Sequence, residues 1–503
     1  MTFGEILAKR AELNPSDVAV VFGDRRFTYR ELHSRTNRLA DALGARGLRK
    51  GARAAALMFN SSEFIEIYFA LAKSGAVMVP VNFRLAPPEI LHVLNDSGAE
   101  ILFYGNEQKD KVEALKGEKS AVREFIPLGP VYDRLLDSGA DRTPDAGVSM
   151  DDPQIIMYTS GTTGKPKGAT LTHGNSVWNS INGIIDFGIR KDDVTLVCAP
   201  MFHVGALNIL TTPHLHIGGR VVITSVFNPS EALKLIEKEK ATNMFAVPTM
   251  FEFMLKAPEI ETADLSSLRY FVTGGSPCPV PLIEEYSRRL GVVFLQGYGL
   301  TESSPSALLL KHEDALRKAG SVGKPFVHVD VKVVNAAGAP AAPGEVGEII
   351  IRGPTVMKGY WNNPDATAEA VRGGWLYTGD LARVDDEGYI YIVDRRKDMI
   401  ISGGENIYPA EIEAVLVTHD AVAEAGVIGV PDEKWGETPL ALIVRKQDAD
   451  PSPDEIIAFC RKNLAPYKCP KRIEFVESLP RTPTGKILKK ELRETHGKGG
   501  GLG

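Results

Sequence analysis

The chain has 503 residues, of which 44% are apolar and 24% are charged, and its formal net charge is −6. That length is more than one hydrophobic core usually serves, so we expect two or more domains. The acidic balance offers no electrostatic basis for binding nucleic acid, and no apolar run is long enough to span a membrane.

The cysteines and the N-terminus indicate a reduced, cytoplasmic protein. Cys198, Cys278, Cys460 and Cys469 form no C-x-x-C pair and are too few for a disulfide framework in so long a chain. No His/Cys cluster has the ligand spacing of a structural zinc site. The first residues lack the basic and apolar regions of a secretory signal.

The first part of the chain, residues 1–150, predicts helices that alternate with short buried strands. Thr28 and Glu31 form a capping-box pattern before one helix, and apolar runs at 54–59 and 101–104 are typical of strands. Strands separated by helices favour a parallel sheet with helices on its faces. No catalytic cluster stands out here, so we interpret this part as scaffold.

The stretch from Met157 to His173 combines glycines, hydroxyl residues and two lysines. Glycines let successive backbone N–H groups converge on an anion, while hydroxyls and lysines add donors and charge. It is not a Walker A loop, because Pro166 follows Lys165. Phosphate binding and a flexible surface linker are both consistent with this composition.

The ten residues from Thr159 to Gly168 resemble the phosphate loop of the adenylate-forming superfamily, which includes acyl-CoA synthetases, luciferases and peptide-synthetase adenylation domains. The resemblance implies an acetyl-CoA synthetase-like fold: a large N-terminal α/β domain with parallel sheets and a small β-barrel-like part, then a smaller mobile α+β domain. Thr162 is implied to be catalytic. The residues implied to bind ATP here are Thr159, Ser160, Gly161, Thr162, Thr163, Gly164, Lys165 and Lys167.

A buried strand is expected at 194–199, and the segment after it resembles the family's aromatic motif beside the acyl carboxylate. His203 is then a substrate contact rather than a base, because a carboxylate nucleophile is already ionised at pH 7. Amino-acid-activating relatives carry an Asp here, but none occurs between Pro200 and Leu207, so a buried ammonium would lack a partner. The predicted acyl contacts are Phe202, His203, Val204, Leu207, Phe245, Gly299 and Ser303.

Two strand-and-turn units are predicted at 245–251 and 270–276, followed by the sequence Gln296 to Glu302. The latter resembles the family's adenine-and-metal motif, in which Tyr298 would stack on adenine, while Thr301 and Glu302 would hold Mg²⁺. Glu302 is also implied to be catalytic. The remaining expected ATP contacts are Gly274, Gly275, Ser276, Gln296, Gly297 and Gly299.

Antiparallel strands with turns are expected at 344–351 and 388–393. Asp380, at an expected loop end between them, matches the family's ribose ligand, and Arg395 is a second candidate. The charged run 394–398 resembles the domain boundary, with Lys397 as the hinge. The resemblance thus implies an AMP-binding domain over 1–394, a hinge over 395–398 and a mobile C-terminal domain over 399–503.

The C-terminal part predicts a small α+β domain, with a helix from Pro409, another capped at Ser452, and strands around Val427, Leu442 and 473–476. Two of its loops resemble functional loops of the family. Ser402, Gly403, Gly404 and Glu405 would face the active site during thioester formation. Lys486 matches the catalytic lysine, whereas the neighbouring Lys489 and Lys490 are expected to be exposed and inert.

The implied reaction joins an ionised acid to the α-phosphorus of ATP, releases pyrophosphate, and then passes the acyl group to CoA. Its cofactors would be ATP, Mg²⁺ and CoA. Soluble bacterial fatty-acyl-CoA synthetases are the nearest resemblance, which implies a medium- to long-chain fatty acid as the substrate. The alternatives are aryl-CoA ligases of the coumarate, ferulate or benzoate type, carrier-protein loading, luciferase chemistry and a catalytically dead nucleotide sensor. Chain length, a homodimer and peripheral membrane contact stay open.

Overall fold

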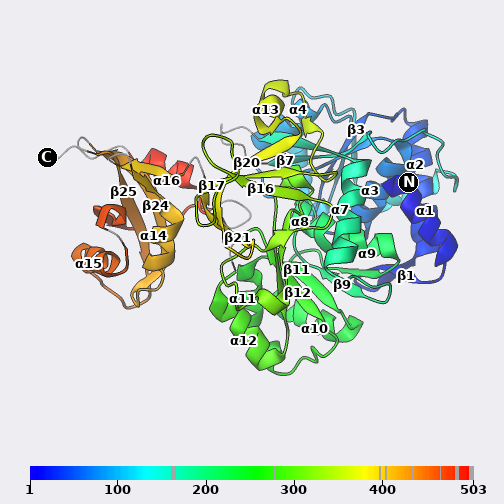
Figure 1. The fold of residues 1–503 in the computed structure, drawn as a ribbon. Helices are drawn as coiled ribbons and strands as arrows, with labels where there is room; N and C mark the ends of the chain where they lie inside the picture. The colour runs from blue at the N-terminus through cyan, green and yellow to red at the C-terminus, as the bar shows by residue number, and fades with distance from the viewer. Residues whose placement is uncertain are drawn as a thin grey trace. The chain divides into compact units, whose positions relative to one another are not determined.

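The computed structural model describes residues 1–159, 166–276, 278–395, 398–402, 405–432, 435–464, 466–481 and 486–497 (Figure 1). The chain divides into two compact units. The larger unit comprises Met1–Val331 and Ile351–Tyr377, and the smaller comprises Lys332–Ile350 and Thr378–Gly503. The predicted domain limits came from the family resemblance and stay a prediction.

The larger unit holds a nine-stranded sheet in the order β15-β14-β13-β12-β11-β9-β10-β1-β2. Its six central strands run parallel, while β2, β14 and β15 pair antiparallel at the edges. The strands are β1 (Val18–Phe22), β2 (Arg25–Thr28), β9 (Val194–Val197), β10 (Arg220–Ile223), β11 (Asn243–Ala246), β12 (Tyr270–Gly274), β13 (Phe294–Tyr298), β14 (Leu308–Leu310) and β15 (Lys324–Pro325).

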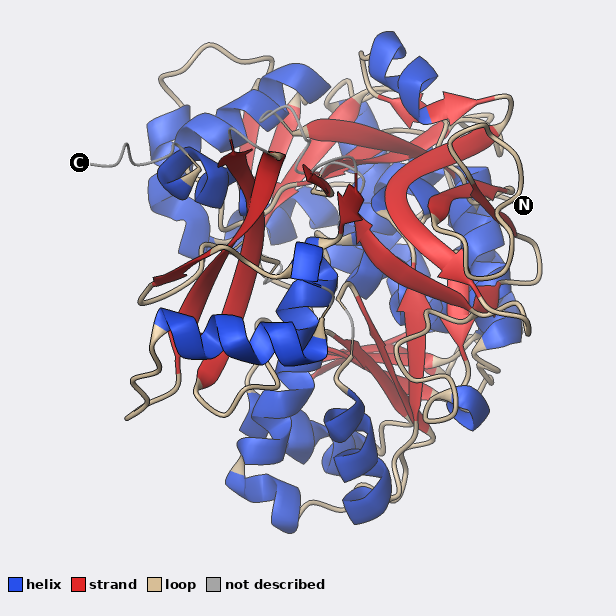
Figure 2. Ribbon diagram, turned by 60° about the vertical axis from the view of Figure 1, so that its left-hand side comes forward, coloured by secondary structure: helices blue, strands red, loops and turns tan. Residues whose placement is uncertain are grey.

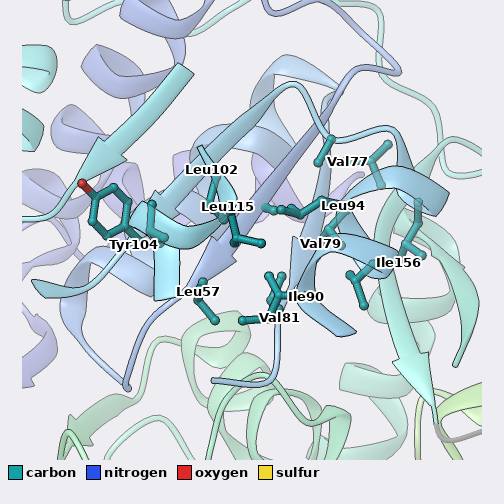
Figure 3. Close-up of a cluster of buried hydrophobic side chains, with 14 residues drawn as sticks. Leu57, Val77, Val79, Val81, Ile90, Leu94, Leu102, Tyr104, Leu115 and Ile156 are labelled. Carbon is teal, nitrogen blue, oxygen red and sulfur yellow. The ribbon is translucent and has the colours of Figure 1, made fainter. Parts of the chain in front are cut away.

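A seven-stranded sheet in the same unit has the order β18-β8-β7-β4-β3-β5-β6. Leu57, Val79 and Leu102 project from it toward Ile90 and Leu94 of helix α4 (Pro87–Ser97) and form a buried apolar cluster with them (Figure 3). The strands are β3 (Arg53–Leu57), β4 (Val77–Pro80), β5 (Ile101–Tyr104), β6 (Glu124–Pro127), β7 (Pro153–Thr159), β8 (Lys167–Thr172) and β18 (Gly359–Tyr360).

Helices connect these strands, and local caps explain several of their starts. The N–H of Glu31 donates to the Thr28 hydroxyl, which confirms the predicted capping box. The helices are α1 (Phe3–Leu13), α2 (Tyr29–Ala45), α3 (Ser62–Ser74), α4 (Pro87–Ser97), α5 (Lys109–Leu115), α6 (Pro130–Asp137), α7 (His173–Asp186), α8 (Val204–Ala206), α9 (Thr212–Ile217), α10 (Pro229–Glu239), α11 (Pro248–Lys256), α12 (Val280–Leu290) and α13 (Pro364–Ala370). The short turns are η1 (Asn106–Gln108), the π-helical η2 (Leu207–Thr211), η3 (Pro258–Glu261), η4 (Thr301–Ser303) and η5 (His312–Asp314).

A third sheet has the order β16-β17-β20-β19, with β21 paired to β20. Its antiparallel pairs agree with the antiparallel strands expected beyond residue 344. Its strands are β16 (Asp330–Val334), β17 (Gly347–Arg352), β19 (Val371–Arg372), β20 (Trp375–Val384) and β21 (Ile390–Arg395). Two boundaries differ from expectation. Asp380 lies within β20 rather than at a loop end, and residues 248–251 form the start of α11 because Pro248 suits a first helical turn.

The smaller unit has a second sheet with helices on both faces (Figure 2). Alternate residues of β24 and β25 pack on α14 and α15 on one face, and on Leu492 of α16 on the other. The elements are β22 (Ile400–Ser402), β23 (Glu405–Ile407), α14 (Pro409–Leu416), β24 (Val422–Asp432), β25 (Gly436–Arg445), α15 (Pro453–Asn463), η6 (Pro466–Lys468), β26 (Arg472–Phe475) and α16 (Lys489–His496). The predicted α+β pattern is confirmed.

Three histidines of the larger unit, His173 and His214 fully buried and His216 half-buried, should make its stability depend on pH. Burial lowers the pKa of His173, His214 and His216 from about 6.5 to about 4. The unfolded chain therefore binds protons first as the pH falls, and stability should decrease between about pH 6.5 and 4, by up to about 1.4 kcal/mol per pH unit for each histidine. Urea midpoints measured at pH 7, 6 and 5 test this. His216→Gln should reduce the slope, and equal slopes would contradict the assignment.

Candidate active site

The β7–β8 hairpin holds both ends of the predicted phosphate loop. Thr159 and Lys167 pair with each other across the hairpin, and the Thr159 hydroxyl donates a hydrogen bond to the Lys167 carbonyl at 3.4 Å. Ser160, Gly161, Thr162, Thr163, Gly164 and Lys165 lie outside the described residues. A Cβ at Gly168 would come within 2.6 Å of the Ile156 side chain. This position of β8, next to the phosphate loop, therefore needs glycine.

The predicted adenine segments follow neighbouring parallel strands. Gly274 of β12 and Gly297 of β13 are register partners, and a Cβ at Gly274 would lie 2.8 Å from the Gly297 carbonyl oxygen. Gly275 has a φ of +83°, which favours glycine. Gly275, Ser276 and the half-buried Tyr298 thus lie at the carboxyl ends of adjacent strands, where open α/β sheets bind ligands. Gln296 instead donates from its side-chain amide to the Ser321 carbonyl at 3.0 Å.

The predicted metal residues occupy a tight turn. Thr301 and Glu302 begin η4, and a Cβ at Gly299 would lie 1.4 Å from the Pro305 carbonyl oxygen, so the turn requires glycine there. The half-buried Glu302 carboxylate accepts a hydrogen bond from the Tyr360 hydroxyl at 2.8 Å. In the described part of the chain no group of three His, Cys, Asp or Glu side chains could hold a metal. That Glu302 holds Mg²⁺ together with substrate phosphates stays a prediction.

Two of the predicted acyl contacts, Phe202 and His203, belong to a row of aromatic rings. Phe83 and Phe202 have centroids 5.1 Å apart, and Phe202 and His203 have centroids 4.2 Å apart. Phe245 packs over Gly205, where a Cβ would lie 3.0 Å from its ring. A cavity of about 10 Å³ adjoins Phe245 and is lined by Thr195, Leu196, Val197, Ala199, Ala206, Leu210, Thr211 and Phe245.

The other acyl candidates are more enclosed. Val204 is 8% exposed and opens α8, and the fully buried Leu207 begins the π-helical η2, a feature that often accompanies functional sites. Ser303 is also fully buried, and its hydroxyl is hydrogen-bonded to backbone groups of Leu300 within the turn. Gly299 lies in that same turn. Contact of these residues with an acid stays a prediction, and for Ser303 the observed bonds indicate a role in shaping the turn.

In the smaller unit, the two ribose candidates lie opposite each other. Asp380 of β20 and Arg395 of β21 are register partners, and Asp380 is 4% exposed. The Asp380 N–H donates to the Thr378 hydroxyl at 3.0 Å. The side chain of Arg395 lies outside the described part, as do Lys397, Gly403, Gly404 and the side chain of Glu405. Ser402 pairs with Glu405 across the β22–β23 hairpin.

Lys486 is exposed and lies next to a pair of backbone contacts. An antiparallel bridge joins Arg481 to Ile487, and the Leu488 N–H donates to the Pro480 carbonyl at 2.8 Å. The backbone is thus held immediately before and after the segment that ends in Lys486. A restrained backbone lowers the entropic cost of placing a side chain on a substrate.

The structure corrects the expectation that Lys489 is exposed. Its ammonium lies 2.9 Å from the Glu413 carboxylate, and the two side chains are 13% and 19% exposed. Glu413 also accepts from the Val427 N–H at 2.7 Å, and burial raises its pKa. No pattern in the sequence predicts this pair, because Glu413 lies on α14 and Lys489 opens α16, far along the chain.

Lys489→Met should destabilise the smaller unit by about 1–3 kcal/mol, because it leaves the half-buried Glu413 carboxylate without its cation. Lys489→Met combined with Glu413→Gln should recover part of that loss, since glutamine still accepts from Val427. Urea unfolding of the single and double variants measures this. A single variant as stable as the unchanged protein would show that the pair contributes nothing.

None of the helices in the described part of the chain is both long and apolar enough to cross a bilayer.

Family models match most of the chain. The model described as "AMP-binding enzyme" matches residues 7–361, and "AMP-binding enzyme C-terminal domain" matches residues 411–486. The chain belongs to the AMP-binding, adenylate-forming enzyme family. The predicted fold class, a large α/β part followed by a smaller α+β part, is confirmed with it.

Similar proteins include ligases for both aryl and fatty acids. A feruloyl-CoA synthase of Amycolatopsis sp is 46% identical over 97% of this chain and 98% of its own. A long-chain-fatty-acid–CoA ligase of Mycobacterium tuberculosis is 43% identical over 98% of each chain. The structure of ATP-bound MatB from Rhodopseudomonas palustris has a TM-score of 0.91 and 31% identity over 99% of each chain.

These findings confirm the coarse activity predicted from the sequence. The protein is an adenylate-forming acid–CoA ligase, and its substrates and cofactors are a small carboxylic acid, ATP, Mg²⁺ and CoA. Sequence reasoning missed Tyr360, which contacts Glu302. Tyr360 and Trp361 are typical strand residues, and nothing in one sequence marks either as functional.

Proposed function

We propose that this enzyme activates an apolar aryl carboxylic acid, of the size of a substituted phenylpropenoate or benzoate. The observation that carries the proposal is the row of rings Phe83, Phe202 and His203 at the segment that resembles the acyl site. Aromatic rings pack favourably edge-to-face against a flat aryl tail. The 46% identity to a feruloyl-CoA synthase agrees with this choice.

The second candidate is the medium- to long-chain fatty acid expected from the sequence, and the 43% identical fatty-acid ligase supports it. A long chain would have to pass Phe245, where the adjoining cavity holds about 10 Å³, roughly the space of one water. Phe245 and the residues around it would then have to move. The aromatic rings beside the predicted acyl segment make the aryl acid the first candidate.

We assign the roles in adenylation by charge. An anionic acid that attacks an anionic triphosphate needs donors and cations around the reacting phosphoryl group. Lys167 and the loop that begins at Thr159 would bind phosphate oxygens, Tyr298 would stack on adenine, and Asp380 with Arg395 would hold the ribose. Glu302 and Thr301 would hold Mg²⁺, which neutralises phosphate charge when bound. Lys486 would bring its ammonium to the attacked phosphoryl group.

A two-conformation cycle accounts for the second step. Lys486 and the entering thiol need the same side of the acyl-adenylate, so the C-terminal domain would rotate about Lys397. That rotation would withdraw Lys486 and bring the loop with Ser402 and Glu405 to the site for thioester formation. A cytoplasmic location is part of the same proposal, supported by the four cysteines, which are all free thiols.

The decisive experiment is an acid panel. Purified enzyme with ATP, Mg²⁺ and CoA is given cinnamate- and benzoate-type acids and saturated acids from acetate to long chains, and AMP release is measured with and without CoA. We expect the highest kcat/KM for an aryl acid. A preference for long saturated acids would move the assignment to the second candidate. If no acid of either kind led to pyrophosphate release, both candidates would be overturned.

A further inference from the structure

Residues 357–361, which we call the strap, join the metal turn to the strand that leaves the phosphate loop. The Met357 N–H donates to the Glu302 carbonyl at 2.8 Å. On the other side, the Trp361 N–H donates to the Gly168 carbonyl at 2.7 Å, and Gly359 and Tyr360 pair antiparallel with β8. The strap is thus hydrogen-bonded to both motifs, which lie more than a hundred residues apart in the sequence.

The side chain of Tyr360 also contacts both motifs. Its hydroxyl donates to Glu302 Oε1 at 2.8 Å. Its ring centroid lies 5.3 Å from Lys167 Nζ, a cation–π distance. One half-buried residue therefore contacts both the carboxylate expected to hold the metal and the lysine expected to hold phosphate.

The chemistry of a phenol suits this position. An ammonium and a carboxylate that met directly would form an ion pair, and each would be less available for substrate. A neutral hydroxyl fixes one carboxylate oxygen without cancelling the charge, and leaves the other oxygen for a cation. A ring face attracts the ammonium without supplying a counter-charge.

We propose that Tyr360 is a positioning residue that holds Glu302 for the metal and Lys167 for the phosphates, and keeps the two from neutralising each other. This inference rests on the proposed roles of Glu302 and Lys167. In this proposal the hydroxyl and the ring of Tyr360 have separate roles. The hydroxyl governs the metal-dependent share of ATP binding, and the ring governs the metal-independent share.

The test is calorimetric titration of ATP into the full-length protein, with no acid present, once in Mg²⁺ and once in EDTA. Tyr360→Phe keeps the ring, so the ATP affinity in EDTA should be unchanged, while the gain in affinity from Mg²⁺ should fall about tenfold. Tyr360→Leu removes the ring as well, and its affinity in EDTA should fall about two- to fivefold.

Tyr132→Phe is the matched control, because the Tyr132 hydroxyl donates to Glu66 at 2.7 Å in the scaffold. It should lower thermal stability and leave both ATP affinities unchanged. The inference is overturned if Tyr360→Phe keeps the full Mg²⁺ gain, or if both variants change ATP affinity alike. Glu302→Gln gives a second reading: in that background Tyr360→Phe should have no further effect on the Mg²⁺ gain, and an added loss would contradict the contact.

The same titration separates this inference from the proposed function. If the unchanged protein binds ATP without any gain from Mg²⁺, or does not bind ATP, the roles of Glu302 and Lys167 fail first. If it binds ATP with the gain and Tyr360→Phe is identical to it, only the role of Tyr360 fails.

Discussion

Lys486→Ala should lower the rate of adenylate formation by about 10²–10³-fold, while thioester formation from supplied acyl-adenylate proceeds at the unchanged rate. In the proposed role the Lys486 ammonium would stabilise charge that develops during attack on the phosphoryl group, and removing one such donor costs about 3–4 kcal/mol. CoA attack on a finished adenylate does not need that charge. Pyrophosphate release reports the first step, and acyl-CoA formation from synthetic acyl-adenylate reports the second.

Lys490→Ala is the matched control for this experiment. Lys490 is 61% exposed and lies 3.7 Å from Glu494 one helical turn on, an exposed pair of little energetic value. Both steps should be unaffected in that variant. Loss of both steps in Lys486→Ala would refute the division of labour between two conformations. Retention of both would remove Lys486 from the mechanism.

Local signals in the sequence were enough to place most of the elements. The capping pair at Thr28 and Glu31, and the serine cap at Ser452, act within four residues of the backbone that they satisfy. Apolar runs such as 101–104 are buried on both faces and needed no knowledge of their neighbours. Asp380 is expected at a loop end because Asp is common in turns and caps, but it lies within β20.

What the sequence could not supply is pairing over long distances. The strap is hydrogen-bonded to β8, but a two-residue strand such as β18 carries no pattern that selects its partner. The Glu413–Lys489 pair depends on how α14 and α16 pack on opposite sides of the same sheet. The site residues themselves came from motif resemblance, which assigns roles residue by residue, and their supporting contacts had to come from the fold.

Asp380→Asn should raise the KM for ATP by about tenfold or more, because a hydrogen bond from a ribose hydroxyl to a charged acceptor contributes about 1.5–3 kcal/mol. The sharper measurement compares ATP with 2′-deoxy-ATP and 3′-deoxy-ATP. The unchanged enzyme should discriminate against the analogue that lacks the bonded hydroxyl, and Asp380→Asn should lose most of that discrimination. Asp385→Asn is the control, since Asp385 accepts from the Glu387 and Tyr389 N–H groups in the turn of the same hairpin. It should discriminate like the unchanged enzyme. If Asp380→Asn still discriminates fully, the carboxylate does not touch the ribose, and Asp380 is a structural residue of β20.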